Sequence, residues 1–213
     1  MYLLILLILT SFCIIHAEEY PDPKLGFYVG AGVVATKADN AELKTFTNSG
    51  INNEIEVDTG HQIDFMLGNQ IHKNWRIEFE ASYGENNLKS IKIQGIDLSW
   101  SGQITRFNAM TNIIYNFRTG PLGFYIGGGA GLTYIETRSS NISLNNGTII
   151  SATGGSDIIF NSQFLAGVDL PLSNSFDVFA GYKLQISDDF NIKGNDYKSP
   201  LIHGVSFGIR GRF

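Results

Sequence analysis

Histidines and paired acidic residues are the side chains in this sequence whose chemistry would first indicate catalysis or metal binding. His61 and His203 fall near the ends of predicted strands, which allows a metal-pair or catalytic interpretation. Neither has a serine or a carboxylate at a recognisable spacing, and histidine suits a membrane boundary because only its tip is polar, so we interpret both as rim residues. Asp188 and Asp189 could help to hold a cation, although two adjacent acids are typical of a solvated loop. The Gly-rich segment 123–134 is not a phosphate loop, because neither a helix pattern nor a lysine directly follows it.

Charged side chains also occur at alternate positions of short segments, opposite apolar ones. In segment 75–83 five apolar residues alternate with Arg76, Glu78, Glu80 and a serine. Successive side chains of a strand point to opposite faces, so each such segment should have one apolar and one polar face. The pattern recurs in segments 26–35, 61–71, 75–83, 104–117, 123–134, 158–170, 176–186 and 201–213. The sequence therefore predicts an all-β chain in which one face of each strand meets an apolar environment.

The connections between these segments alternate in length. Short turns lie at 72–74, 118–122 and 171–174, and long polar loops lie at 37–60, 84–103, 138–157 and 187–200. Within the second of these loops, residues 88–98 have enough β-branching to extend the hairpin beyond a membrane. Outer-membrane barrels have short periplasmic turns and longer external loops, whereas a soluble sandwich has no reason to keep this alternation. We therefore predict an eight-stranded antiparallel up-and-down transmembrane β-barrel.

Composition and charge agree with this fold class. Charged residues make up only 16% of the chain, and it contains 24 glycines. A barrel exposes only one face of each strand to lipid, so it needs less apolar sequence than a helical membrane protein. The net charge of −5 argues against a nucleic-acid partner, which would require a basic patch.

The first 17 residues are predicted to be a secretory signal peptide. Residues 3–9 are continuously apolar, and Ala17 is a small residue before a polar stretch. The apolar run is shorter than the roughly 20 residues of a membrane-spanning helix. The sole cysteine, Cys13, lies inside this segment, after a residue too large for a lipoprotein anchor. We therefore expect residues 18–213 to form one cysteine-free outer-membrane barrel domain.

The last segment follows the same alternation and ends on an aromatic residue. Phe207, Ile209 and Phe213 share its apolar face. A terminal strand frays unless it is tied into a sheet, and in a closed barrel the last strand must pair with the first. Segment 201–213 is therefore expected to close the ring.

The polar faces predict a charged lumen. The inward charges in the lower part of the barrel are Arg76, Glu78, Glu80, Asp169, Asp177, Arg210 and Arg212. Because unpaired buried charges are expensive, we expect these three arginines and four acids to form one network. Eight strands leave an interior about wide enough for side chains to fill, so this network should act as a plug. No cofactor and no metal ion are expected.

Four stretches carry a resemblance to a known group of proteins: 27–32 (FYVGAG), 74–78 (NWRIE), 112–117 (NIIYNF) and 179–183 (FAGYK). The chain resembles the small opacity and OmpA-type outer-membrane barrels, and among them it is similar to surface antigens of rickettsial and other alphaproteobacterial species. The resemblance implies location in the outer membrane, contact with its lipid, and external loops that act as antigen or adhesin. It also implies a host-cell surface receptor as a partner.

The same resemblance implies that the barrel-assembly machinery reads the terminal strand, through Phe207, Ile209 and Phe213. Two other functions stay open at this point. A small-conductance porin is the nearer alternative, and an outer-membrane barrel enzyme (a lipase, an acyltransferase or a protease) is the more distant one. An enzyme needs a nucleophile, a base and an orienting acid brought together; no such set is adjacent in the sequence, although residues of separate strands could meet. We therefore expect no enzymatic activity.

Overall fold

The computed structural model describes residues 25–39, 41–43, 54–93, 96–119, 122–138, 140–143, 149–152, 154–192 and 195–213. The predicted signal peptide, with Cys13 and His16, lies outside the described residues. Within these ranges no helix is long and apolar enough to cross a membrane.

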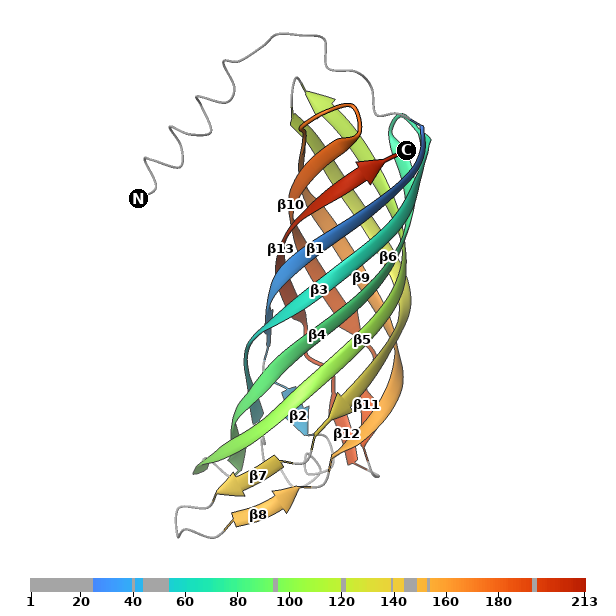
Figure 1. The fold of residues 1–213 in the computed structure, drawn as a ribbon. Helices are drawn as coiled ribbons and strands as arrows, with labels where there is room; N and C mark the ends of the chain where they lie inside the picture. The colour runs from blue at the N-terminus through green and yellow to red at the C-terminus, as the bar shows by residue number, and fades with distance from the viewer. Residues whose placement is uncertain are drawn as a thin grey trace, which may run out of the picture.

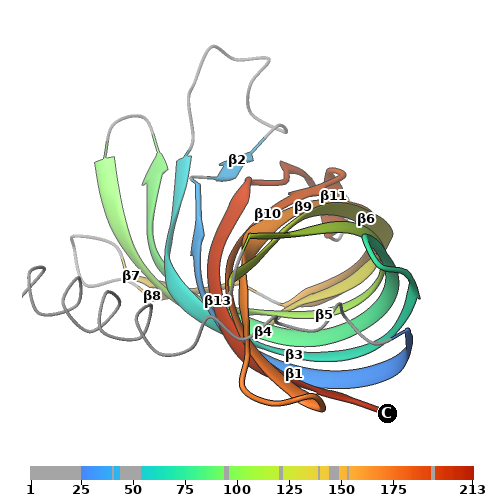
Figure 2. The same cartoon turned by 90° about the horizontal axis from the view of Figure 1, so that it is seen from above.

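Eight long strands form the wall of the molecule (Figure 1). They are β1 (Gly26–Ala38), β3 (Glu54–His72), β4 (Trp75–Ile93), β5 (Ile96–Thr119), β6 (Leu122–Thr137), β9 (Gly155–Pro171), β10 (Phe176–Ser187) and β13 (Ile202–Arg212). Each strand pairs antiparallel with the next in this order. The view from above shows the strands arranged as a ring (Figure 2), as predicted.

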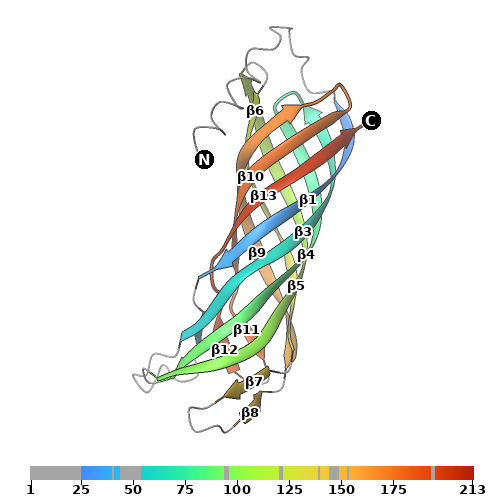
Figure 3. The same ribbon diagram turned by 60° about the vertical axis from the view of Figure 1, so that its left-hand side comes forward.

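The ring closes where the last long strand meets the first. β13 pairs antiparallel with β1, from Tyr28 opposite Arg212 to Ala38 opposite Ile202. Beyond this register the backbone nitrogen of Phe213 donates a hydrogen bond to the carbonyl of Phe27 at 3.0 Å. Figure 3 shows the two strands side by side along the seam. The expected pairing of the last strand with the first is confirmed.

Several strands are longer than predicted. Residues 84–103 are predicted as a long loop whose β-branched part, 88–98, could extend the hairpin beyond the membrane, and β4 and β5 do stay paired through this region as far as Ile93 opposite Ile96. The strand pattern used for prediction requires lipid on one face, and that pattern disappears where a hairpin continues into water. The hydrogen bonds of the hairpin do not depend on lipid, so the pairing continues.

The other predicted loops also contain short strands at the end of the barrel opposite to Phe213 (Figure 1 and Figure 3). These are β2 (Ala41–Leu43), β7 (Ser140–Ser143), β8 (Ile149–Ala152), β11 (Phe190–Ile192) and β12 (Asn195–Lys198). β2 pairs with β3, β12 pairs with β2, and β7 pairs with β5 and β8. This end of the molecule therefore extends the barrel wall with additional sheet.

The outer face is apolar and carries aromatic residues near both ends. Phe65 and Phe164, for example, are each about three-fifths exposed. Near the short turns, the rings of Trp75 and Tyr115 lie 5.0 Å apart. Toward the other end, Tyr83 lies 4.8 Å from Phe107. An apolar band between two aromatic girdles is the outer surface of a membrane barrel.

Candidate functional site: the filled lumen

The seven charged residues predicted for the lumen all turn to the inside of the barrel. Arg76, Glu78, Glu80, Asp169, Asp177 and Arg210 are buried, and the side chain of Arg212 is 13% exposed. They lie on β4, β9, β10 and β13 at alternate positions, opposite the exposed apolar residues. They do not form a single network, however, but take part in separate groups at different levels.

Lys183 and Asp64, which were not among the predicted site residues, are at the centre of the middle level. Lys183 Nζ lies 2.6 Å from Asp64 Oδ2 and 2.6 Å from Glu80 Oε1, with all three side chains at least 95% buried. Gln62 donates a hydrogen bond to Asp64 Oδ1 at 2.7 Å, and Gln163 donates to Glu80 Oε2 at 3.3 Å. Glu80 therefore pairs with a lysine rather than with the expected arginines.

Sequence alternation alone places Lys183 and Asp64 on the inner face. What it does not show is which inward side chains meet across the lumen, because that depends on how the strands are staggered around the ring. The inward position of both residues was therefore predictable from the sequence. Their contact with Glu80 follows only from the arrangement of strands in the closed ring.

A second group lies nearer the short turns. Asp177 is 3.1 Å from Arg210 Nη1 and accepts a hydrogen bond from Arg212 Nε at 2.9 Å. The Arg210 guanidinium also lies 4.7 Å from the ring centre of Phe179 and 5.6 Å from that of Tyr125. Stacking of a guanidinium on aromatic faces adds to the ion pair where both are shielded from water.

Glu78 and Asp169 have different surroundings from those expected. Glu78 accepts a hydrogen bond from the hydroxyl of Tyr28 at 2.7 Å. Arg76 donates to the side-chain oxygen of Asn116 and lies 5.0 Å from the ring centre of Tyr125. Among the described residues Asp169 makes no ion pair within 4.0 Å. The four acids therefore do not share the three arginines in one network.

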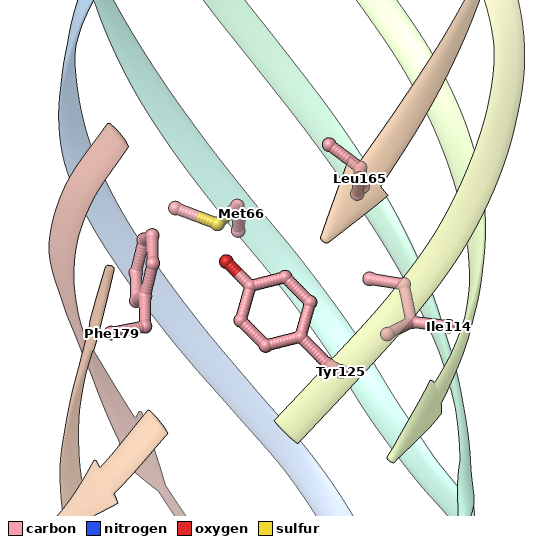
Figure 4. Packing of buried hydrophobic residues seen from close by; sticks show 5 residues of the cluster. All are labelled: Met66, Ile114, Tyr125, Leu165 and Phe179. Carbon is pink, nitrogen blue, oxygen red and sulfur yellow. The ribbon is translucent and has the colours of Figure 1, made fainter. Parts of the chain in front are cut away.

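Apolar side chains fill the section between these levels. Figure 4 shows Met66, Ile114, Tyr125, Leu165 and Phe179, which come from five different strands. The wall makes room for the two rings with glycines: a Cβ at Gly181 would lie 2.1 Å from the Tyr125 hydroxyl, and one at Gly208 would lie 2.4 Å from Phe179. A cavity of about 30 Å³ is left beside this cluster, which is roughly the volume of one water molecule.

The outer part of the lumen is polar and then closed by a second apolar group. Asn108 donates to Ser82 at 2.7 Å, and it accepts from Thr133 at 2.7 Å. Above this chain of hydrogen bonds, Ile135 and Ile159 pack with Phe190. Phe190 belongs to a segment predicted as a loop, and the residue is 94% buried because it packs against Ile135 of β6 and Ile159 of β9.

The two rim histidines lie on the outer face of the wall. His61 Nε2 is 3.9 Å from Glu85, and its side chain is 70% exposed. His203 contacts the hydroxyl of Tyr182 and lies 3.7 Å from Asp39. Each histidine therefore has a carboxylate nearby, which the sequence spacing did not indicate. In the described parts of the chain, no three His, Cys, Asp or Glu residues gather as a metal site would require.

These features define the class of protein. A closed antiparallel ring with an apolar outer band, two aromatic girdles and a polar interior is a transmembrane β-barrel. Residues 4–213 match the family model described as "Outer membrane protein beta-barrel domain", so the chain belongs to this family. The protein is therefore located in the outer membrane.

Comparison with solved structures agrees with the fold. Neisserial surface protein A is 19% identical, with a TM-score of 0.52 over 88% of this chain and 97% of that one. OprG of Pseudomonas aeruginosa is 14% identical, with a TM-score of 0.52 over 89% and 98%. The outer-membrane protease OmpT of Escherichia coli is 5% identical, with a TM-score of 0.58 over 90% and 97%.

At these identities the likeness shows the fold alone. A comparison with curated protein sequences found no match. The similarity to rickettsial surface antigens stays a prediction, as does reading of Phe207, Ile209 and Phe213 by the barrel-assembly machinery.

Proposed function

We propose that this protein is a surface interaction protein of the antigen or adhesin type, whose external end binds a host-cell or environmental surface. The observation that carries the proposal is the length of the strands. β4 has 19 residues and β5 has 24, whereas a strand needs about 9–11 residues to cross a membrane.

The surplus length lies at one end of the barrel. The girdle pair of Tyr83 and Phe107 is followed by a hairpin that stays paired as far as Ile93 and Ile96. At about 3.3 Å per residue, the ten steps from Tyr83 to Ile93 reach roughly 33 Å along the strand. Short turns of outer-membrane barrels face the periplasm, so this hairpin projects from the cell.

In the described residues, the projecting part consists of paired strands. β7 pairs with β5 at Trp100 opposite Ile142, and β12 pairs with β2 at Tyr197 opposite Leu43. Binding residues are often carried by connections that a rigid scaffold holds in position. Insertion in the membrane does not need this extra sheet, which supports a role in contact with another surface.

A transport function receives less support from the lumen. The apolar cluster around Tyr125 and the ion pairs of Lys183 occupy the same narrow interior, and the space beside them holds roughly one water molecule. We therefore propose that the lumen is a plug and that the protein is not a general porin.

The alternative function is an enzyme at the outer rim, and one contact of His203 favours it. His203 touches the hydroxyl of Tyr182 and lies close to Asp39, and a base beside an acid occurs in many hydrolytic sites. His203 lies on the lipid-facing side of the wall, level with the girdle, where packing of a tyrosine and a histidine at the membrane boundary accounts for the contact.

The test is to shorten the external hairpin without disturbing the barrel. Residues 87–103 are replaced by Asn-Gly, which favours a tight two-residue turn between Asn86 and Ile104, a pair in the native register. Folding is followed by the heat-dependent shift in gel mobility, and binding of intact cells to cultured host cells is measured. The matched control replaces the exposed Ser173 and Asn174 of the opposite turn with the same dipeptide.

We expect the shortened barrel to fold while binding falls to background, with binding of the control variant unchanged. Binding equal to that of the parent would contradict the proposal. A hydrolytic or acyl-transfer activity that disappears in His203→Ala would favour the enzyme instead.

A further inference from the structure

The sheet that extends the barrel wall at its external end stops at a strand with one unpaired edge. β5 pairs with β7 and β7 pairs with β8, and among the described residues the strand order ends there. The antiparallel pair of β7 and β8 runs from Ser140 opposite Ala152 to Ser143 opposite Ile149. Figure 1 and Figure 3 both show β8 beyond β7, on the side away from the barrel. One edge of β8 therefore presents backbone N–H and C=O groups that no described strand uses.

This edge lacks the features with which proteins usually protect an exposed strand, which are charged side chains, prolines and bulges. Residues 139–156 contain no charged residue and no proline, and the register of β7 and β8 has no shift. The other three external connections, 37–60, 84–103 and 187–200, each contain four or more charged residues. Protection by charge is therefore missing from one part of the external end, and that part contains the unpaired edge.

The chemistry of the edge determines what can bind to it, and a second copy of β8 has the matching groups. N–H and C=O groups at the spacing of a strand are complementary to the backbone of another extended strand. Two identical strands pair antiparallel about a two-fold axis, and each then offers the groups that the other needs. Like charges directly opposite each other would destabilise such a pair. Ile150 can lie opposite Ile150 of the second copy, and no residue of either strand is charged. Segment 37–60 has no such match with its own copy, because it contains five acids and two lysines.

The position of the edge places the second copy on another cell. Short turns of outer-membrane barrels face the periplasm, and β8 lies at the opposite end of the molecule, beyond the barrel wall (Figure 1). A copy in the same membrane presents its edge in the same outward direction, so the two edges do not face each other. A copy in a facing membrane presents its edge toward the first.

We propose that β8 pairs edge to edge with β8 of a second copy of this chain on a facing cell, so that the protein joins cells that carry it. The contact is an antiparallel strand pair that continues the external sheets of both molecules. A single pair of four-residue strands binds weakly, but many copies on each surface act together and raise the overall strength of attachment. The proposal goes beyond the binding of host cells and depends only on the external position of this end.

The test exchanges charge across the proposed pair. Ile150→Lys and Ile150→Glu are produced separately in a bacterial strain that does not clump by itself. Asn87→Lys and Asn87→Glu are matched controls, because Asn87 is an exposed residue of the external hairpin. Cells of each variant carry one of two fluorescent labels, and clumping is measured by the rate of settling and by the fraction of two-colour clumps. The heat-dependent shift in gel mobility verifies folding, and binding to cultured host cells is measured on the same cells.

We expect the parent protein and both Asn87 variants to clump cells. Cells with Ile150→Lys alone or Ile150→Glu alone should stay dispersed, because like charges then meet across the pair, and mixing the two populations should restore clumping in two colours. Failure of the parent to clump cells, or failure of the mixture to recover, would overturn the proposal while leaving the result for host-cell binding unaffected. Loss of host-cell binding in the Ile150 variants, without clumping by the parent, would also overturn it and would indicate that the edge receives a strand of a host protein.

Discussion

Lys183 on β10 and Glu80 on β4 meet across the lumen, with Nζ and Oε1 2.6 Å apart. In the closed order of strands, β10 and β4 are four positions apart in a ring of eight, so they are opposite walls. The two side chains are 5% and 2% exposed. This ion pair, shared with Asp64, therefore connects the two halves of the barrel through its interior.

Replacement of Lys183 by methionine should be the most destabilising single change in the lumen. It would leave Asp64 and Glu80 buried without their cation, at a cost of about 3–5 kcal/mol. The measurement is the urea midpoint of unfolding in lipid vesicles, with the exposed Lys37→Met as control. Restored stability in Lys183→Met/Asp64→Asn/Glu80→Gln would show that the stranded charges cause the loss. A midpoint for Lys183→Met equal to that of Lys37→Met would contradict the assignment.

Arg210→Ala should also lower the midpoint, but by less. Asp177 keeps its hydrogen bond from Arg212, so the carboxylate is not left alone. Loss of one charge-assisted contact is expected to cost about 2 kcal/mol. Arg210→Lys keeps the charge but not the planar stacking on Phe179, and it should fall between the parent and Arg210→Ala. A midpoint for Arg210→Lys as low as that for Arg210→Ala would mean that stacking, not charge, is what matters.

Gly181→Ala should destabilise the barrel through one identifiable clash. The added Cβ would lie 2.1 Å from the Tyr125 hydroxyl, and the next nearest atom is 3.1 Å away. In a Tyr125→Phe background the first contact is absent, so the same substitution should cost clearly less. Unfolding midpoints of the two single variants and the double variant provide the comparison. Equal losses of stability in the two backgrounds would show that the added methyl group clashes with the backbone of the barrel wall and not with the Tyr125 side chain.

The native barrel should show little conductance in planar bilayers. Tyr125 and Phe179 fill the same section of the lumen, and the cavity beside them has room for about one water molecule. The double variant Tyr125→Ala/Phe179→Ala should conduct measurably more, provided that its gel mobility shows a folded barrel. Large and stable steps from the native protein, unchanged in the double variant, would instead indicate an open pore.

The orientation of the barrel can be tested with single cysteines. The sole native cysteine is Cys13, in the predicted signal peptide, so the processed parent should not react. On intact cells a membrane-impermeant maleimide should label Asn87→Cys in the external hairpin. Ser173→Cys, in the turn between β9 and β10, should react only after the outer membrane is permeabilised. The reverse pattern would place the short turns outside.

Alternation of side chains was sufficient to predict most of the barrel wall. Segment 75–83 shows why: each apolar residue from Trp75 to Tyr83 meets lipid, and each residue between them turns inward, so the pattern is uninterrupted. The bounds of the strands were harder to predict where lipid no longer selects one face. Residues from Asn86 to Ile93 still form strand pairs, and the sequence indicated a longer hairpin there only through β-branched residues, not through a period of two.

The sequence predicts which side chains point into the lumen, but it does not predict which of them contact each other. Lys183 and Asp64 sit at inward positions by the same alternation that placed Glu80, yet the three meet only because of the tilt and stagger of the closed ring. Phe190 could not be assigned at all, since a residue in a short strand among polar neighbours shows no periodicity. Phe190 is buried because β11 brings it over the barrel mouth, next to Ile135 and Ile159.

The contact between Lys183 and Glu80 has a consequence for sideways opening. To release a molecule into the bilayer, a barrel must separate β1 from β13 and widen, and widening moves β10 away from β4. The separation would break a buried ion pair in addition to the backbone hydrogen bonds of the seam. Interactions that must be broken before a structure opens slow the opening and prolong its lifetime. A lateral exit through the wall is therefore opposed from the interior of the barrel as well as at the seam itself.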